Sequence, residues 1–250
     1  MSVFAGNRFA DRIVGNSAAS LEAFVVSGGR RERTAVVFNG IDAPAIPAAT
    51  MQETARRIRA GFGGGEKKIV GLFSRIAPWK GQHVLLEALA ELPEMNAWFI
   101  GAPLFGDEVR YQEKLIARAK SRGLLDRVRF LGFRDDIPDL LHAVDFVVHT
   151  SISPEPFGRV IVEGMLAGKP VIATRAGGAC EIIQDGETGC LVSPGDSGAL
   201  AATLRRLVEQ PDEATRIGMA GKLSAIDRFS VEKMVRGIER EVSAVLAAGR

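Results

Sequence analysis

Short apolar runs alternate with amphipathic segments along most of the chain. The runs have the length and composition of buried strands, and they fall at Ile69–Phe73, Ala97–Ile100, Val128–Leu131, Phe146–His149, Val171–Thr174 and Cys190–Val192. Between them, apolar residues recur every three or four positions, which predicts helices at Gln82–Leu92, Arg110–Arg122, Val160–Ala167 and Ala199–Leu207. Strands and helices that alternate in this way predict an α/β fold, with a parallel sheet covered by helices on both faces.

The two ends of the chain follow a different pattern. Near the amino terminus, a strand at Arg12–Gly15, a helix from Ser17 to about Val26 and a strand at Ala35–Phe38 predict a small α/β unit. It is too short to close a sheet alone. A Pro- and Ala-rich stretch at Asp42–Ala49 has the composition of a linker, and a helix at Met51–Ala60 and the Gly-rich segment 61–65 follow it. The last helix, Val231–Leu246, has an apolar face that needs another surface to cover it.

Composition and charge exclude several classes of protein. The 250 residues are 46% hydrophobic and 25% charged, the usual mix for a folded globular chain. Lys and Arg number 32 against 30 Asp and Glu, and this balance gives no sign of a nucleic-acid partner. No apolar run reaches the ~18 residues that a membrane span needs. The two cysteines, Cys180 and Cys190, do not make a disulfide framework and favour a cytoplasmic location.

Common phosphate and metal motifs fail on inspection. GFGGGEKK has Glu66 where a P-loop needs its second glycine, and the segment precedes a strand instead of following one. Pro103 stands where the dinucleotide fingerprint after a strand requires glycine. The chain has no D-x-D pair, and its three histidines lack ligand spacing, so we predict no metal site. His149, at the carboxyl end of a strand, stays open between a structural and a functional role.

The strongest chemical segment runs from Ser153 to Pro170 and leads from a strand into a helix. The backbone amides of Phe157, Gly158, Arg159 and Val160 fall at the predicted helix start, where unpaired donors and the helix dipole favour an anion, most naturally phosphate. Pro156 suits a helix start. Glu155 and Glu163 bracket these amides, about 12 Å apart if the segment is helical throughout. Such acids can accept the hydroxyls of a donor sugar and of a ribose.

Three further strand-to-helix loops complete the candidate site. Arg75 and Lys80 flank a tight turn, and two cations there can neutralise a diphosphate leaving group. Gly132, Phe133 and Arg134 can offer backbone groups and a flat face to a base. The glycines before Glu181 allow close approach of a ligand, and for Glu181 we expect at most an orienting role.

These residues together resemble a known family. Five motifs occur in one order over residues 66–230, namely SRIAPWKG, LGFRDD, EPFGRVIVEGMLAGKPV, GGACEII and DGETGCLVSPGD. They resemble the carboxyl-terminal domain of the family 4 retaining glycosyltransferases (glycosyltransferase group 1, GT-B fold), and VGNSAASLEAFV and VVFNGID resemble the tail of that family's amino-terminal domain and its hinge. Pro156 departs from the family pattern, in which glycine is common.

The resemblance implies a division of the chain and a set of roles. Residues 1–45 would be the remnant of an amino-terminal acceptor domain with its hinge, 46–65 a linker helix and Gly-rich loop, 66–230 a Rossmann-like nucleotide-sugar-binding domain, and 231–250 a helix packing toward the amino-terminal domain. Arg75, Lys80 and Glu155 would be the catalytic set, with the two cations on the diphosphate and Glu155, with the Phe157–Gly158 backbone, on the donor sugar. Glu163 would bind the ribose.

The implied activity is transfer of a sugar from a UDP-, GDP- or ADP-linked donor, with retention of configuration and without a metal or other cofactor. The acceptor would be a saccharide or a lipid-linked molecule, which adds peripheral association with the inner membrane face as an alternative to a purely cytoplasmic location. Family members carry a whole acceptor domain before the hinge, so we expect this chain to be a donor-binding half that is inactive alone. A non-catalytic nucleotide-sugar-binding module, or a half-enzyme that needs a partner chain, is the alternative.

Overall fold

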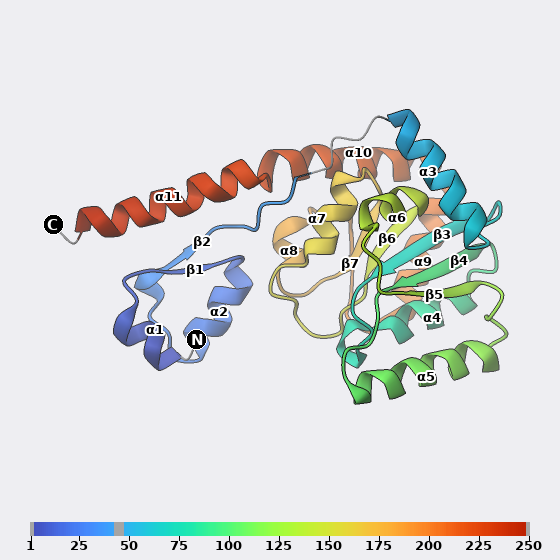
Figure 1. The fold of residues 1–250 in the computed structure, drawn as a ribbon, viewed down its shortest axis with the longest axis horizontal. Coiled ribbons are helices and arrows are strands. Elements are labelled where there is room, and N and C mark those ends of the chain that lie inside the picture. The colour runs from blue at the N-terminus through green and yellow to red at the C-terminus, as the bar shows by residue number, and fades with distance from the viewer. Residues whose placement is uncertain (1–2, 43–47, 249–250) are drawn as a thin grey trace.

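The computed structural model describes residues 3–42 and 48–248. Its main body is a six-stranded parallel sheet (Figure 1). The strands are β3 (Lys68–Phe73), β4 (Met95–Ile100), β5 (Val128–Gly132), β6 (Phe146–His149), β7 (Val171–Thr174) and β8 (Cys190–Val192). They lie in the order β5-β4-β3-β6-β7-β8, the doubly wound arrangement in which the direction of strand addition reverses between β3 and β6. The predicted fold class is confirmed.

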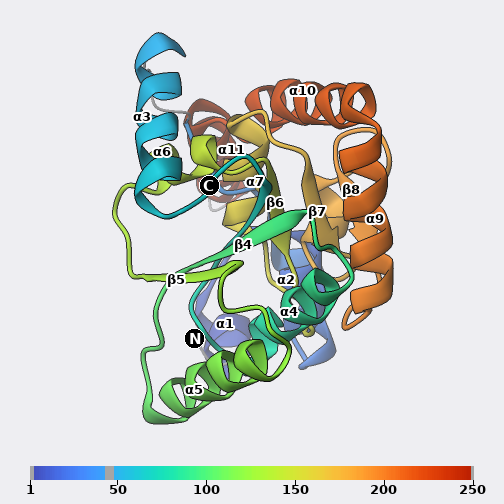
Figure 2. The same cartoon turned by 90° about the vertical axis from the view of Figure 1, so that its right-hand side faces the viewer.

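Two apolar layers sandwich this sheet because successive side chains of a strand point to opposite faces. Val70 and Leu72 pack on one side, and Ile69 and Phe73 pack on the other. The first layer is covered by α4 (Gln82–Ala90), α5 (Gly106–Ser121) and α9 (Ser197–Glu209). The second is covered by α3 (Ala48–Gly61), α6 (Ile137–Ala143), α7 (Arg159–Leu166) and α8 (Ala179–Ile182), and Figure 2 shows α3 and α6 across the sheet from α4 and α5.

Helix α10 (Pro211–Arg228) and helix α6 were not assigned in the sequence analysis. Helix α10 contributes buried residues to both apolar layers, and α6 is only seven residues long. Mixed packing of this kind breaks the simple one-sided periodicity by which a helix is recognised.

The amino-terminal segment forms a separate small unit. It contains α1 (Val3–Phe9), β1 (Ile13–Gly15), α2 (Ala18–Val26), the 3-10 turn η1 (Arg31–Arg33) and β2 (Thr34–Val36). Strands β1 and β2 pair in parallel and make a sheet of only two strands. The expected linker stretch falls largely on residues 43–47, outside the described residues, and so does the expected boundary at 45/46.

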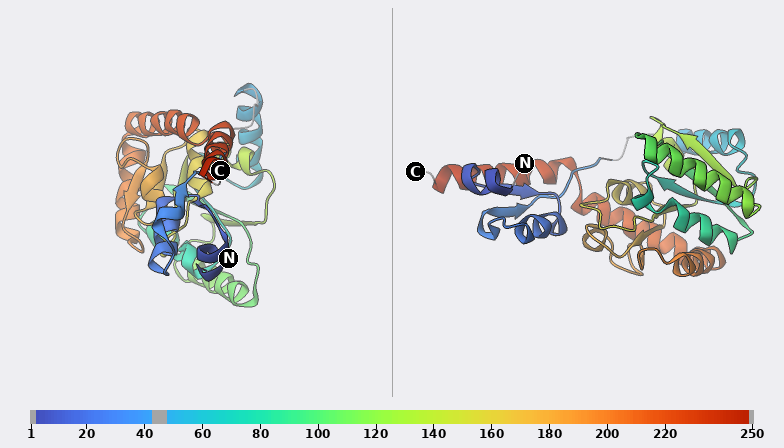
Figure 3. Two further views of the ribbon diagram at one scale, coloured as in Figure 1. Left: turned by 90° about the vertical axis from the view of Figure 1, so that its left-hand side faces the viewer. Right: turned by 90° about the horizontal axis from the view of Figure 1, so that it is seen from below.

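The last helix, α11 (Val231–Ala248), runs alongside this unit, away from the main sheet (Figure 3). Arg12 Nε lies 2.7 Å from Glu241 Oε2 across the contact. Gly237 is the one buried residue of the helix, and a Cβ there would lie 2.8 Å from a methyl group of Val37. A residue without a side chain therefore allows α11 to lie close to the chain that leaves β2.

The small unit also touches the main body next to the loop after β6. Ser17 caps α2 by accepting a hydrogen bond from the Ser20 amide, and its hydroxyl donates to the carbonyl of Pro156. The Glu181 carboxylate accepts hydrogen bonds from the amides of Ala18 and Ala19, at 2.8 and 2.9 Å. Glu181 therefore orients the start of α2, where its carboxylate satisfies backbone N–H donors that have no partner within the helix.

Candidate functional site

The candidate site lies at the point where the sheet reverses its order. β3 and β6 are neighbours, and both end at the same edge because they are parallel. The loop that carries Arg75 and Lys80 follows β3, and the loop that carries Glu155 follows β6. Crevices at such switch points are where open α/β sheets bind ligands.

Lys80 and Glu155 form a part-buried ion pair between these two loops. Lys80 Nζ lies 2.6 Å from Glu155 Oε2, and the two side chains are only 14% and 16% exposed. Lys80 is held at the end of the 3-10 turn η2 (Pro78–Lys80), and Gly81 after it has φ of 68°. Burial raises the pKa of the Glu155 carboxyl, but hydrogen bonds from His149 and Lys80 outweigh it and lower the pKa to about 2. Glu155 is therefore a carboxylate at neutral pH.

The backbone of Glu155 is fixed by the glycines after β7. The amide of Gly178 donates to the Glu155 carbonyl at 2.9 Å. Gly177 has φ of 58°, and a Cβ added to it would lie 2.2 Å from the same carbonyl oxygen. The close approach that the sequence analysis expected of these glycines is thus made by the Glu155 loop.

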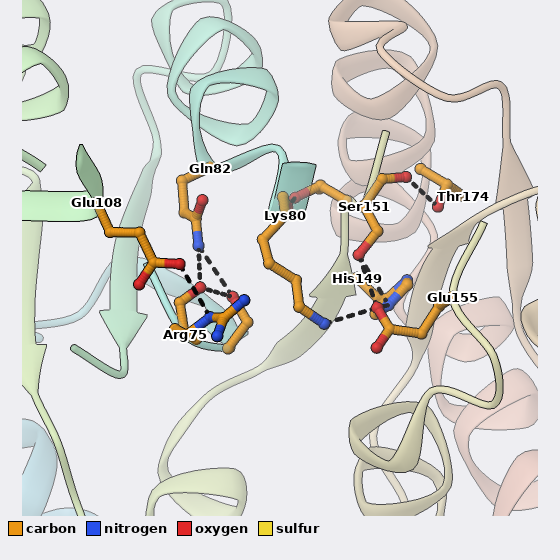
Figure 4. Close-up of polar contacts among 10 residues, drawn as sticks. Arg75, Lys80, Gln82, Glu108, His149, Ser151, Glu155 and Thr174 are labelled. Carbon is orange, nitrogen blue, oxygen red and sulfur yellow. Dashed lines mark hydrogen bonds and ion pairs between the residues drawn. The ribbon is translucent and has the colours of Figure 1, made fainter. Parts of the chain in front are cut away.

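Arg75 pairs with a different acid from the one that pairs with Lys80. Its Nε lies 3.2 Å from Glu108 Oε1 in α5, and Glu108 is 4% exposed. Glu108 also accepts a hydrogen bond from the Leu104 amide at 2.8 Å. Gln82, fully buried, donates to the Arg75 carbonyl at 2.8 Å. Figure 4 shows Arg75 with Glu108 and Gln82 as one group of contacts, and Lys80 with Glu155 as another.

The start of α7, where the sequence predicts an anion, is not capped by any side chain of the described residues. The helix begins at Arg159, three residues later than Pro156 suggested, because Gly158 takes a left-handed φ of 95° and the chain turns there. The Glu155–Glu163 segment is therefore helical only in its second half, and the 12 Å estimate for a continuous helix does not apply. Glu163 is half-buried and lies 3.4 Å from Arg159 on the same helix face.

Two adjoining hollows open between the loops. One, of about 370 Å³, is lined by Lys80, His149, Glu155, Phe157, Gly158, Arg159, Val160 and Glu163, with Asn16 and Asn39 of the amino-terminal segment. The other, of about 480 Å³, is lined by Arg75, Phe133, Arg134, Val160 and Glu163. Val160 and Glu163 line both, so the two hollows share a wall.

The remaining predicted residues take separate places around these hollows. Phe157 can offer only its backbone to the hollow, because its ring is buried and packs against Phe229, with 5.8 Å between the ring centroids. Phe133 is 82% exposed at the rim. Arg134 forms a two-pronged ion pair with Asp136, at 2.8 and 2.6 Å, and this bond lowers the pKa of the Asp136 carboxyl. Gly132 accepts a hydrogen bond from the Gly101 amide.

Several residues of the site were missed by the sequence analysis. Glu108, Gln82 and Ser151 are buried polar residues that contact the predicted ones. Glu108 is separated by 33 positions from Arg75, and a pairing over that distance leaves no signal in a single sequence. Ser151 lies two residues beyond His149 in the loop after β6, so its position at a strand end could have identified it.

The described residues contain neither a metal-binding cluster nor a membrane-spanning helix. Within residues 3–42 and 48–248, no three His, Cys, Asp or Glu side chains gather closely enough to hold a metal ion. None of the helices described here combines the length and the apolar character needed to cross a bilayer.

A six-stranded parallel sheet with a polar cleft at its switch point, bordered by a small unit that contacts the last helix, matches the carboxyl-terminal half of the GT-B class of glycosyltransferases. Within that class, the chain belongs to the glycosyl transferases group 1 family, whose model matches residues 55–224. The family resemblance predicted from the five motifs is thereby confirmed.

Similar proteins of known name are also glycosyltransferases. The chain is 36% identical over 164 residues to the lipopolysaccharide core biosynthesis glycosyltransferase LpsE of Rhizobium meliloti, covering 66% of this chain and 46% of LpsE. It is 32% identical to the D-inositol 3-phosphate glycosyltransferase of Mycolicibacterium smegmatis, covering 82% of this chain and 47% of that one. The chain thus spans about half the length of these curated relatives.

A solved structure extends the likeness to the amino-terminal unit. Anabaena Alr3699/HepE in complex with UDP-glucose superposes with a TM-score of 0.91 at 42% sequence identity, covering 97% of this chain and 66% of that one. Coverage of this extent includes the small unit and α11 as well as the main sheet.

Proposed function

We propose that this chain binds a nucleotide sugar in the cleft at the switch point and supplies the donor-binding part of a sugar transferase. The observation that carries the proposal is the hollow in which Lys80, Glu155 and the uncapped start of α7 meet. A cation and free backbone amides suit a diphosphate, and a carboxylate beside them suits the hydroxyls of an attached sugar. Binding of UDP-glucose by HepE, 42% identical, supports a UDP-linked hexose as the donor and a hexosyltransferase as the activity.

Each residue would take one part in donor binding. Arg75 and Lys80 bind the diphosphate, Glu155 and the Phe157–Gly158 backbone hold the sugar, and Glu163 accepts the ribose hydroxyls. In the second hollow, the base lies against the loop that carries Phe133 and Arg134, beside Gly132. This assignment places all parts of one extended ligand in two hollows that share a wall.

The reaction would retain the configuration of the sugar and draw its electrophilic assistance from the protein's own cations. As the bond between the sugar and the phosphate oxygen breaks, its electron pair moves to the diphosphate. Arg75, Lys80 and the helix start stabilise the charge that develops there. The acceptor hydroxyl attacks the same face of the sugar, and the leaving phosphate oxygen takes its proton. Lys80→Ala should cost on the order of 2–4 kcal/mol of transition-state stabilisation, by analogy with loss of one oxyanion donor.

Titration calorimetry with UDP, GDP, ADP and UDP-glucose tests donor binding on this chain. We expect heat from at least one nucleoside diphosphate, and no heat from any of them would overturn the proposal. An assay of sugar release with saccharide and lipid-linked acceptors tests the second half of it. Binding without transfer would favour a half-enzyme that acts with a partner chain, whereas turnover by this chain alone would contradict our expectation that it is inactive by itself.

A further inference from the structure

Two residues behind Glu155 make a contact that no part of the proposed reaction uses. His149, the last residue of β6, is 5% exposed, and Ser151 is 1% exposed. His149 Nε2 lies 3.2 Å from Glu155 Oε2, and the Ser151 hydroxyl donates to the same oxygen at 3.0 Å. Ser151 is fixed in turn by Thr174, whose hydroxyl donates to the Ser151 carbonyl at 2.8 Å (Figure 4).

All the hydrogen bonds that the described residues make to the Glu155 carboxylate end on one oxygen. Lys80 Nζ is the third donor to Oε2, after His149 and Ser151. Figure 4 shows the other oxygen, Oε1, turned away from these donors. An oxygen left free in this way can accept a hydroxyl of a sugar without breaking a bond inside the protein.

The hydrogen-bond network favours one protonation form of the His149 ring. Nδ1 is buried and has no partner among the described residues. A proton on Nδ1 would bury an unsatisfied N–H donor, whereas a proton on Nε2 points toward Glu155 Oε2 and Ser151 Oγ, each 3.2 Å away. A ring with its proton on Nε2 therefore fits the site, and it makes His149 a donor to Glu155.

A bound diphosphate would affect the three hydrogen bonds to Glu155 Oε2 differently. Lys80 lines the hollow and carries a full positive charge, so a diphosphate competes with Glu155 for it. The Ser151 side chain lies behind Glu155 and is almost fully buried, out of reach of the diphosphate. His149 borders the same hollow, but its residue is only 5% exposed and its Nε2 is turned to Glu155 Oε2. Binding of the donor would thus remove one of three bonds to Oε2 and leave the other two.

We infer that His149 and Ser151 are positioning residues that keep Oε1 of Glu155 aimed at the donor sugar after the diphosphate has drawn Lys80 away. This inference rests on the proposed function. Both residues act through Glu155, because His149 Nε2 and the Ser151 hydroxyl are bonded to its Oε2. Their loss should therefore weaken binding of the sugar part of the donor and spare binding of the nucleoside diphosphate.

The test compares affinities for UDP-glucose and UDP by titration calorimetry in matched variants of the whole chain. His149→Phe keeps a ring of similar size but removes the donor, whereas His149→Gln keeps an N–H at a similar reach. We expect H149F to weaken UDP-glucose binding about tenfold, as for loss of one hydrogen bond to a charged group, and to change UDP binding less than twofold. H149Q should restore UDP-glucose binding to within about threefold of the unmodified chain.

The control variant is His83→Phe, which removes the hydrogen bond between His83 on α4 and Tyr111 on α5. Neither residue lines the two hollows. It should leave both affinities unchanged. Equal weakening of UDP and UDP-glucose by H149F, or no recovery in H149Q, would overturn the inference. Failure of the unmodified chain to bind either ligand would instead refute the proposed function. If H149F does not fold, Ser151→Ala carries the same test, with the same expected split between the two ligands.

Discussion

The ion pair between Lys80 and Glu155 leads to an unusual expectation, which is that removing an acid of the site improves binding of part of the ligand. In the free protein, Lys80 Nζ is bonded to Glu155 Oε2 at 2.6 Å between two largely buried side chains. A nucleoside diphosphate lacks the transferred sugar that Glu155 would hold, so it gains nothing from that carboxylate. It must nevertheless separate Lys80 from it. Glu155→Gln removes this competition.

The size of the effect follows from the pair that is broken. A hydrogen bond to a charged group contributes about 1.5–3 kcal/mol net in folded proteins, and part of it survives in a glutamine side chain that still accepts from Lys80. We therefore expect UDP to bind E155Q more tightly by about 1–2 kcal/mol, which is roughly fivefold to thirtyfold in affinity. UDP-glucose should lose this advantage, because the glutamine holds the sugar hydroxyls less well than a carboxylate does.

Titration calorimetry with both ligands checks the prediction, and thermal denaturation checks that the variant is folded. Glu187→Gln is the matched control, because it removes the same charge from an exposed position outside the two hollows. E187Q should bind both ligands like the unmodified chain. UDP affinity that is unchanged or lower in E155Q would refute the exchange of Lys80 between Glu155 and the diphosphate.

Three further changes test the packing and charge around the same loop. Gly177→Ala places a Cβ against the Glu155 carbonyl at a left-handed φ and should destabilise the chain by about 2–4 kcal/mol in chemical denaturation. A loss below about 1 kcal/mol would contradict this packing argument. Glu181→Ala removes the acceptor for the Ala18 and Ala19 amides and should cost about 1–2 kcal/mol, seen in the same assay. The pKa of Glu155 lies at about 2 in the fold against about 4.3 when unfolded, so its stabilisation is full above pH 5 and disappears as the pH falls toward 2. That loss is on the order of 3 kcal/mol. Urea denaturation at several pH values between 3 and 6 should show that the free energy of unfolding falls less steeply with falling pH in E155Q than in the unmodified chain.

The strands and the edge of the sheet that carries the site were predictable because they depend on short-range pattern. The run Ile69–Phe73 is observed as β3, Lys68–Phe73, and Phe146–His149 is observed as β6 without change. The carboxyl ends of parallel strands meet at one edge, so the loops after them were predictable as neighbours. The helix predicted at Val160–Ala167 is observed as α7, Arg159–Leu166. The earlier start that Pro156 suggested lies three residues too early, because the left-handed turn at Gly158 cannot be told from a helical one in a single sequence.

What the pattern could not supply is the choice of partner for each charged group. Lys80 and Arg75 were expected as two cations that share one task, yet the structure pairs them with different acids on different elements. Glu108 comes from α5, whose start was predicted four residues too late, so this residue fell outside the expected helix. Such pairings depend on how the layers pack in three dimensions.

The two pairs have different consequences for a ligand because their acids differ in accessibility. Glu155 lines the hollow, so an anion that enters can reach Lys80 and displace the acid from it. The Glu108 side chain is 6% exposed and is tied to the Leu104 amide, so it stays with Arg75 when the anion arrives. The guanidinium can then serve both, with Nε toward Glu108 and its remaining N–H groups free to turn toward the phosphate. On this reasoning Arg75 is a fixed cation whose direction is set before binding, and Lys80 is the mobile one whose release connects the arrival of the diphosphate to the freeing of Glu155.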